Sequence, residues 1–250
     1  MRGLGLVIII ALALTAADSS AEPYSVIFDR GNGFYTDGEY AQAINEYQKI
    51  LVAGFESSEL YFNLGNAYFR DGQLGRAIIN YIRAKRLSPR DDDIQANLDF
   101  AKKHAVDKIE VTESTIIFNY INDFFDSFSL NEITALAFVF YLLTVLAILV
   151  KYAYKIIYIP NPIFVILCVL LAITSIFTVV KIDRDILTRQ GVVIADEVDI
   201  KNGPSGDFDT KFTAHAGLVF KIESEETDYY WVSFENKFKG WIRKGAVDEI

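Results

Sequence analysis

The chain contains one cysteine and two histidines among its 250 residues. A single cysteine, Cys168, excludes a disulfide within the chain, and His104 and His215 lie in different predicted domains. A Cys/His nucleophile pair and a zinc cluster are excluded for the same reason. The sequence also lacks a G-x-S-x-G elbow and a phosphate-cradling loop. We therefore expect a protein that is not an enzyme and that holds no metal and no cofactor.

Charged residues are missing from two long stretches. Residues 133–150 and 156–180 contain no Asp, Glu, Lys or Arg, and runs of 18 and 25 such residues can each cross a hydrocarbon core about 30 Å thick. The sequence therefore predicts two transmembrane helices within 133–180. The loop between them, 151–158, carries Lys151 and Lys155 without an acid, which favours a cytoplasmic position.

The N-terminus predicts export. Met1-Arg2 precedes the apolar run Leu6 to Leu14, and Ser19-Ser20-Ala21 offers the small residues that a signal peptidase recognises. We expect a signal peptide at 1–21 and a mature start at Glu22. An uncleaved anchor is the alternative. With the signal peptide removed, we expect a protein of a bacterial inner membrane with two spans and both aqueous flanks of the hairpin on the outer side. With an uncleaved anchor the repeats are still exported, but their tethering to the membrane differs.

A period of 34 residues organises the first half of the chain. Six residues recur at this offset: Gly31, Phe34, Gly38, Ala43, Ile44 and Tyr47 return as Gly65, Tyr68, Gly72, Ala77, Ile78 and Tyr81. Small residues where two helices touch, with aromatic residues beside them, are typical of a helix-turn-helix solenoid. The first copy is degenerate, with Arg30 in place of Leu64 and Phe55 in place of Pro89.

The second copy resembles the tetratricopeptide repeat (TPR). Leu64-Gly65, Tyr68, Gly72, Ala77 and Tyr81 match that pattern, and Ala84 and Pro89 complete it. A further segment, Asp91 to His104, starts with three acids and carries Ile94, Leu98 and Ala101 on one helical face. We predict an all-α TPR domain at 22–104, made of two repeats and a capping helix.

Residues 105–132 connect the repeats to the first apolar stretch. Ile117, Ile121 and three phenylalanines, Phe124, Phe125 and Phe128, fall at helical spacing against polar residues. One interpretation is an amphipathic helix that lies in the lipid interface. The other is a further packed helix of the repeat domain. Both stay open.

After residue 188 the hydrophobic period becomes that of strands. We predict strands at Val192 to Ala195, Gly217 to Ile222, Tyr230 to Phe234 and Gly240 to Ile242. A chain of this length and pattern forms a small, strongly bent β-barrel. Residues 188–250 resemble the bacterial SH3 domain in Asn202-Gly203-Pro204, His215-Ala-Gly217, Trp231 and Lys239-Gly240-Trp241-Ile242.

Aromatic residues of this domain suit either a groove or a core. Tyr229, Tyr230 and Trp241 are candidates for a partner-binding groove. For Trp231 we favour a place in the core, and for Trp241 both interpretations stay open.

The fold class expected is thus a multidomain membrane protein with an all-α TPR solenoid, a transmembrane helical hairpin and a small all-β SH3-like barrel. This order of modules resembles the BatE-like proteins of bacterial aerotolerance operons. The resemblance implies partners among other membrane proteins, including von Willebrand factor A domain proteins of the same operon. It supplies no known reaction.

Asparagines mark the candidate peptide-binding face of the repeats. Asn32 and Asn66 are 34 residues apart, at the position where TPR proteins use an asparagine to bind a peptide backbone, because an amide both donates and accepts. Asn63, Arg70 and Asn97 are expected to share this concave face. The alternative is that the asparagines only solvate a helix face or cap a turn.

Charge narrows the range of partners. Residues 22–132 carry a net charge of −7 and residues 182–250 a net charge of −5, so nucleic acid is not expected as a ligand. The favoured function is a membrane-anchored adaptor for other proteins. The alternatives are a cell-wall sensor whose SH3-like domain binds peptidoglycan and an uncharacterised enzyme.

Overall fold

A computed structural model describes residues 22–107, 124–153, 161–234 and 238–250. The chain divides into two compact units, Met1–Phe55 and Glu56–Ile250, and each is described by itself. The first contains α2 (Tyr24–Thr36) and α3 (Tyr40–Val52). The second contains α4 (Ser58–Arg70), α5 (Leu74–Leu87), α6 (Asp92–His104), two long helices and a sheet. The predicted signal peptide, 1–21, lies outside the described residues.

The two helix pairs confirm the helical repeat. α4 begins and ends exactly one period of 34 residues after α2, and α5 begins one period after α3. The small residues act as expected. A Cβ on Gly31 would lie 2.6 Å from the Tyr47 ring, and a Cβ on Gly65 would lie 2.8 Å from the Tyr81 ring. Both glycines therefore let paired helices approach closely.

The turns inside the two pairs are also equivalent. Gly38 has φ +80° and Gly72 has φ +82°, a left-handed conformation that glycine adopts without strain. Each turn closes with two backbone hydrogen bonds of the Schellman type, of which the longer-range ones join Glu39 N to Phe34 O and Gln73 N to Tyr68 O. In the second pair, Asp71 is the C-cap of α4 and Gly72 follows it in the turn.

The predicted capping helix is present as α6, which packs against α5. Asp91 is its N-cap, and one carboxylate oxygen accepts hydrogen bonds from Asp93 N at 3.0 Å and Ile94 N at 3.2 Å. The predicted apolar face is buried: Ile94, Leu98 and Ala101 are at most 3% exposed.

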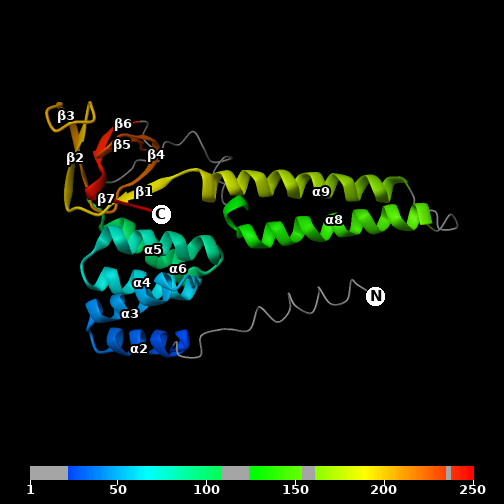
Figure 1. Ribbon diagram of the computed structural model, residues 1–250, viewed down its shortest axis with the longest axis horizontal. Coiled ribbons are helices and arrows are strands. Elements are labelled where there is room, and N and C mark those ends of the chain that lie inside the picture. The colour runs from blue at the N-terminus through cyan, green and yellow to red at the C-terminus, as the bar shows by residue number, and fades with distance from the viewer. Residues whose placement is uncertain (1–21, 108–123, 154–160, 235–237) are drawn as a thin grey trace, which may run out of the picture. The chain divides into compact units, whose positions relative to one another are not determined.

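Helices α8 (Leu130–Ala153) and α9 (Asn161–Ile182) lie side by side (Figure 1). Both are long and apolar enough to cross a membrane, and only 17% and 6% of their most apolar windows are buried within the protein. Large apolar side chains such as Phe138, Leu149 and Ile176 are more than half exposed. Among the described residues, little protein therefore surrounds these helices. Most of the predicted loop 151–158 falls outside the described residues.

Only part of the predicted connecting helix can be located, because residues 108–123 lie outside the described ranges. Phe124, Phe125 and Phe128 pack around Phe177 of α9, and the Phe125 and Phe177 ring centres are 4.2 Å apart. This end of the segment thus covers the apolar hairpin, a packing that neither interpretation from the sequence specified.

Seven antiparallel strands form the C-terminal sheet. Their bounds are β1 (Gln190–Val193), β2 (Glu197–Lys201), β3 (Thr210–His215), β4 (Val219–Glu225), β5 (Tyr229–Ser233), β6 (Lys239–Arg243) and β7 (Val247–Glu249). The order is β3-β2-β6-β5-β4-β1-β7. Within the described residues, these pairings show a sheet ending at β3 and β7 and do not show a closed barrel. One face forms the core, with Val193, Ile200, Ala214, Leu218, Phe220, Ile222, Val232, Phe234, Ile242 and Val247.

The sequence predicted four of these strands and missed β2, β3 and β7. In β2 only Ile200 is fully buried, and in β3 only Ala214. Charged or polar residues occupy most of the other positions, so the apolar signal is weak. Strand β7 is only three residues long.

Helix α5 joins the helical region to the sheet by packing on β1 and β7. A Cβ on Gly75 would overlap Val193 O and lie 2.9 Å from Ile194 Cα. The Arg83 guanidinium donates to Glu249 O at 2.9 Å, and that of Arg86 donates to Gln190 Oε1 at 3.0 Å. The last helical pair and the sheet therefore pack as one body, which the sequence did not predict.

Asp107 closes the same interface from the end of α6. Its carboxylate accepts from His215 N at 2.7 Å, and its other oxygen lies 3.0 Å from His215 Nδ1. Nearby, Gly217 has φ +95°, and a Cβ there would lie 2.9 Å from Ile78 Cδ1 and 3.3 Å from Ala105 Cβ. We call α4, α5, α6, Asp107 and the seven strands together the repeat–sheet module.

Candidate partner-binding surfaces

The two predicted asparagines make the same contact in both copies of the repeat. The Tyr47 hydroxyl donates to Asn32 Oδ1 at 2.7 Å, and the Tyr81 hydroxyl donates to Asn66 Oδ1 at 2.8 Å. Each asparagine is thus held by the tyrosine that also fills the space beside the glycine. This finding favours a defined position for the amide over a freely solvated one.

Asn97 is brought to Asn66, as the prediction of a shared face requires. Asn97 Nδ2 donates to Asn66 Oδ1 at 2.8 Å, so α4 and α6 meet through their amides. Asn63 and Arg70 lie on the same helix as Asn66, and Arg70 is exposed. Asn32 belongs to the other unit. Binding of a partner at any of these residues stays a prediction.

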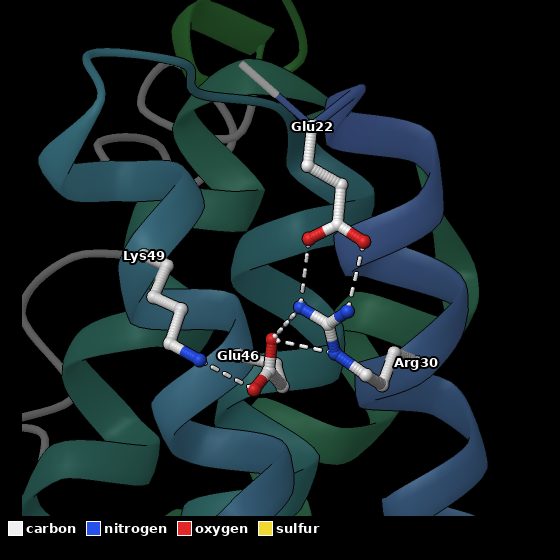
Figure 2. A network of polar contacts seen from close by, with 4 residues as sticks. All are labelled: Glu22, Arg30, Glu46 and Lys49. Carbon is white, nitrogen blue, oxygen red and sulfur yellow. Dashed lines mark hydrogen bonds and ion pairs between the residues drawn. The ribbon is translucent and has the colours of Figure 1, made fainter. Parts of the chain in front are cut away.

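Arg30 occupies the position that Leu64 fills in the second copy, and it builds an ion-pair network (Figure 2). Its guanidinium donates to both Glu22 oxygens, at 2.9 and 3.1 Å, and to Glu46 Oε2 at 2.6 Å. Lys49 Nζ lies 2.6 Å from the other Glu46 oxygen. Glu46 is buried, so both of its oxygens need these cations.

The second copy has uncharged residues at the positions that correspond to Arg30 and Glu46. Residue 64 is a buried leucine, and residue 80, which corresponds to Glu46, is a buried asparagine. Asn80 Nδ2 donates to Arg76 O at 2.8 Å, whereas its Oδ1 has no hydrogen-bond partner among the described residues. The first copy therefore has an ion pair, Arg30 with Glu46, at the two positions that Leu64 and Asn80 occupy in the second copy. The signal in the sequence is that both positions differ between the copies together.

This network predicts a pH dependence. The hydrogen bond from Arg30 lowers the pKa of Glu46 below its ordinary value of 4.5. A lowered pKa in the folded state contributes stability above 4.5, and this contribution is lost as the pH falls through the folded value. We expect hydrogen exchange in α3 to accelerate below that pH more strongly in the wild type than in Arg30→Leu, the residue of the second copy. Equal acid sensitivity of the two proteins would contradict this assignment.

On the sheet, the structure separates the predicted aromatic residues. Tyr230 lies on the core side, and its hydroxyl donates to Glu249 Oε1 at 2.7 Å. This hydrogen bond raises the pKa of Tyr230. The Lys244 ammonium and the Arg189 guanidinium lie 4.9 and 5.5 Å from the centre of its ring. Tyr230 is thus part of a network within the protein.

Trp231 and Trp241 form a pair on the opposite face. They are directly opposite each other on β5 and β6, with ring centres 5.4 Å apart. Both are half-buried and lie outside the core cluster. The preferred interpretation of Trp231 as a core residue is therefore wrong. Strand alternation in the sequence would have predicted the outward position of Trp231. Its neighbour Val232 is fully buried, and successive side chains of a strand point to opposite faces.

Tyr229 shares the outer face with the tryptophan pair, since it lies two residues before Trp231. The Lys211 ammonium lies 5.5 Å from the centre of the Trp231 ring, and Lys201 is directly opposite Trp241 on β2. Tyr229, Trp231 and Trp241 together form what we call the outer aromatic face. Tyr230 is not part of it.

No protein-family model matches the chain, and a search of curated proteins finds no match. Among the described residues, no group of three or more His, Cys, Asp or Glu side chains is arranged to hold a metal ion. The geometry offers surfaces of amides and aromatic rings. Such surfaces suit binding.

Proposed function

We propose that the protein is a membrane-held adaptor whose repeats bind an extended segment of a partner protein. The observation that carries this proposal is the repeated glycine, tyrosine and asparagine arrangement at 31, 47 and 32 and again at 65, 81 and 66. It supports the resemblance to TPR proteins and gives each repeat an amide in a fixed position. The resemblance to BatE-like proteins suggests other membrane proteins as partners.

The amide cluster is suited to a peptide backbone. Both hydrogen bonds that the structure gives Asn66 are accepted by its oxygen, so within the described residues its Nδ2 keeps two protons to donate. Exposed Arg70 lies one helical turn further on the same helix and adds a cation. A polar or acidic segment fits this face better than a basic one.

The two apolar helices would hold the adaptor in the membrane. Their exposed apolar side chains and the hairpin arrangement support two spans. Because α8 begins and α9 ends at the same end of the hairpin, the helices before it and the sheet after it lie on one side of the membrane. By the positive-inside tendency at Lys151 and Lys155, we place that side outside the cytoplasm.

A photo-crosslinking experiment on the full chain in its native membrane tests the adaptor proposal. We expect a photoreactive residue at Asn63 to yield a discrete adduct that Arg70→Glu abolishes. The same residue at Gln42, exposed on the second helix of the first pair, is the matched control. Identical adducts from both positions would exclude a specific groove.

The outer aromatic face supports a second candidate, a cell-wall sensor that binds peptidoglycan. Exposed aromatic faces pack against apolar faces of ligands, and two tryptophans side by side extend that surface. Co-sedimentation of the full chain with purified wall distinguishes the two candidates. Loss of sedimentation in a Trp231→Ala, Trp241→Ala variant that keeps the Asn63 adduct would assign wall binding to the sheet.

A further inference from the structure

A buried lysine lies where α9 ends. Lys181 is 4% exposed, and its ammonium lies 3.2 Å from Asp185 Oδ2 and 3.8 Å from Asp126 Oδ1. Arg184 Nη2 is 3.0 Å from the same Asp126 oxygen. A buried charge is costly unless it is paired, so these carboxylates stabilise Lys181. Asp126 precedes α8, and its ion pairs therefore tie the start of one apolar helix to the end of the other.

Helix α8 begins with a reciprocal cap. Ser129 N donates to Glu132 Oε2 at 2.9 Å, and Glu132 N donates to Ser129 Oγ at 3.3 Å, the arrangement known as a capping box. Glu132 is therefore fixed in position by α8 itself before it contacts any other element.

Arg90, in the turn between α5 and α6, contacts this cap. Its guanidinium pairs with the Glu132 carboxylate and donates to Ser127 O at 2.9 Å. It also lies 5.8 Å from the centre of the Phe128 ring. One side chain of the repeat region therefore makes three kinds of contact with the residues that start α8.

The second helix of the hairpin, α9, is followed almost directly by the sheet. The short π-helix η1 (Asp183–Leu187) follows α9, and only Thr188 and Arg189 separate it from β1. β1 packs on α5. The repeat–sheet module is thus connected to α8 through Arg90 and to α9 through η1 and β1.

We propose that Arg90, Glu132, Asp126 and Lys181 form a juxtamembrane clasp that fixes the repeat–sheet module to the apolar hairpin. The clasp gives the module one orientation relative to the two helices. This inference goes beyond the proposed function and holds for any partner.

Distance measurements between spin labels test the clasp in the full chain in lipid nanodiscs. Cys168→Ala provides the background, with one label at exposed Ala96 on α6 and one at exposed Leu136 on α8. We expect one narrow distance peak, its loss in Arg90→Glu and in Glu132→Arg, and its return in the double variant that exchanges the two charges.

Lys239→Glu is the matched control, because Lys239 and Glu223 form an ion pair on the sheet whose exposure is similar to that of Arg90 and Glu132. It should keep the narrow peak, and circular dichroism should show unchanged helix content in every variant. A broad peak in the unaltered chain, or a narrow one in both single variants, would overturn the clasp. Either result leaves the adaptor proposal standing, because the Asn63 adduct is measured independently.

Discussion

Replacing Gly75 by alanine should break the packing of α5 on the sheet. The new Cβ would overlap Val193 O and approach Ile194 Cα at 2.9 Å. Both are backbone atoms, one in the last residue of β1 and one in the residue after it, so no side chain can rotate to make room. Overpacking of this kind costs about 1–3 kcal/mol, and the hydrogen bonds of Arg83 and Arg86 to the sheet would weaken with it.

Gly33→Ala is the matched control, because a Cβ there meets no atom within 4 Å. In a helix interior, alanine is more favourable than glycine by about 0.5–1 kcal/mol, so this variant should be stabilised. Hydrogen exchange of α5 and β1 in the full chain measures the difference. If the amides of α5 and β1 exchange as slowly in Gly75→Ala as in Gly33→Ala, the close packing at Gly75 is not what joins α5 to the sheet.

The second large effect is expected at Gly65. An alanine there would bring its Cβ within 2.8 Å of two Tyr81 ring atoms, inside the tight pair of α4 and α5. The ring must move or the helices must separate, and we expect a loss of about 1–3 kcal/mol in the free energy of unfolding. Displacing the ring also moves the hydroxyl away from Asn66.

A double-mutant cycle with Tyr81→Leu tests the cause of this loss. With the ring absent, Gly65→Ala should cost much less, giving a coupling energy of about 1 kcal/mol or more by denaturant unfolding. Gly33→Ala combined with Tyr81→Leu should be additive within about 0.5 kcal/mol, because a Cβ on Gly33 meets no atom within 4 Å. Additivity in the first pair would show that the ring contact carries no energy.

The repeats could be predicted from the sequence because their determinants are local. Gly31 and Tyr47 recur as Gly65 and Tyr81 at a fixed offset, and the glycine after the first helix of each pair has nearly the same φ in both copies. The three acids from Asp91 and the apolar periodicity after them indicated a helix start, and Asp91 caps that helix. The two uncharged stretches likewise needed only length and composition.

The contacts between distant segments could not be predicted in this way. Gly75 looks like an ordinary helix residue until Val193 is placed against it, and Asp107 finds His215 more than a hundred residues away. Trp231 was assigned to the core because a small sheet domain needs large aromatic residues there. The strand alternation, which places Trp231 on the outer face, was not given enough weight. Arg30 was noted only as a departure from the repeat, because the accompanying exchange at residue 46 gains its meaning once Glu46 is placed beside Arg30.

The claim on which this account depends is that one membrane hairpin carries the helical repeats and the sheet on the same side. Single cysteines placed at Ala96, Gly245 and Lys151, in a Cys168→Ala background, test it by labelling intact cells with a membrane-impermeant maleimide. We predict that Ala96→Cys and Gly245→Cys react from outside, whereas Lys151→Cys reacts only after the membrane is opened. Labelling of Ala96→Cys and Gly245→Cys from opposite sides would contradict the account.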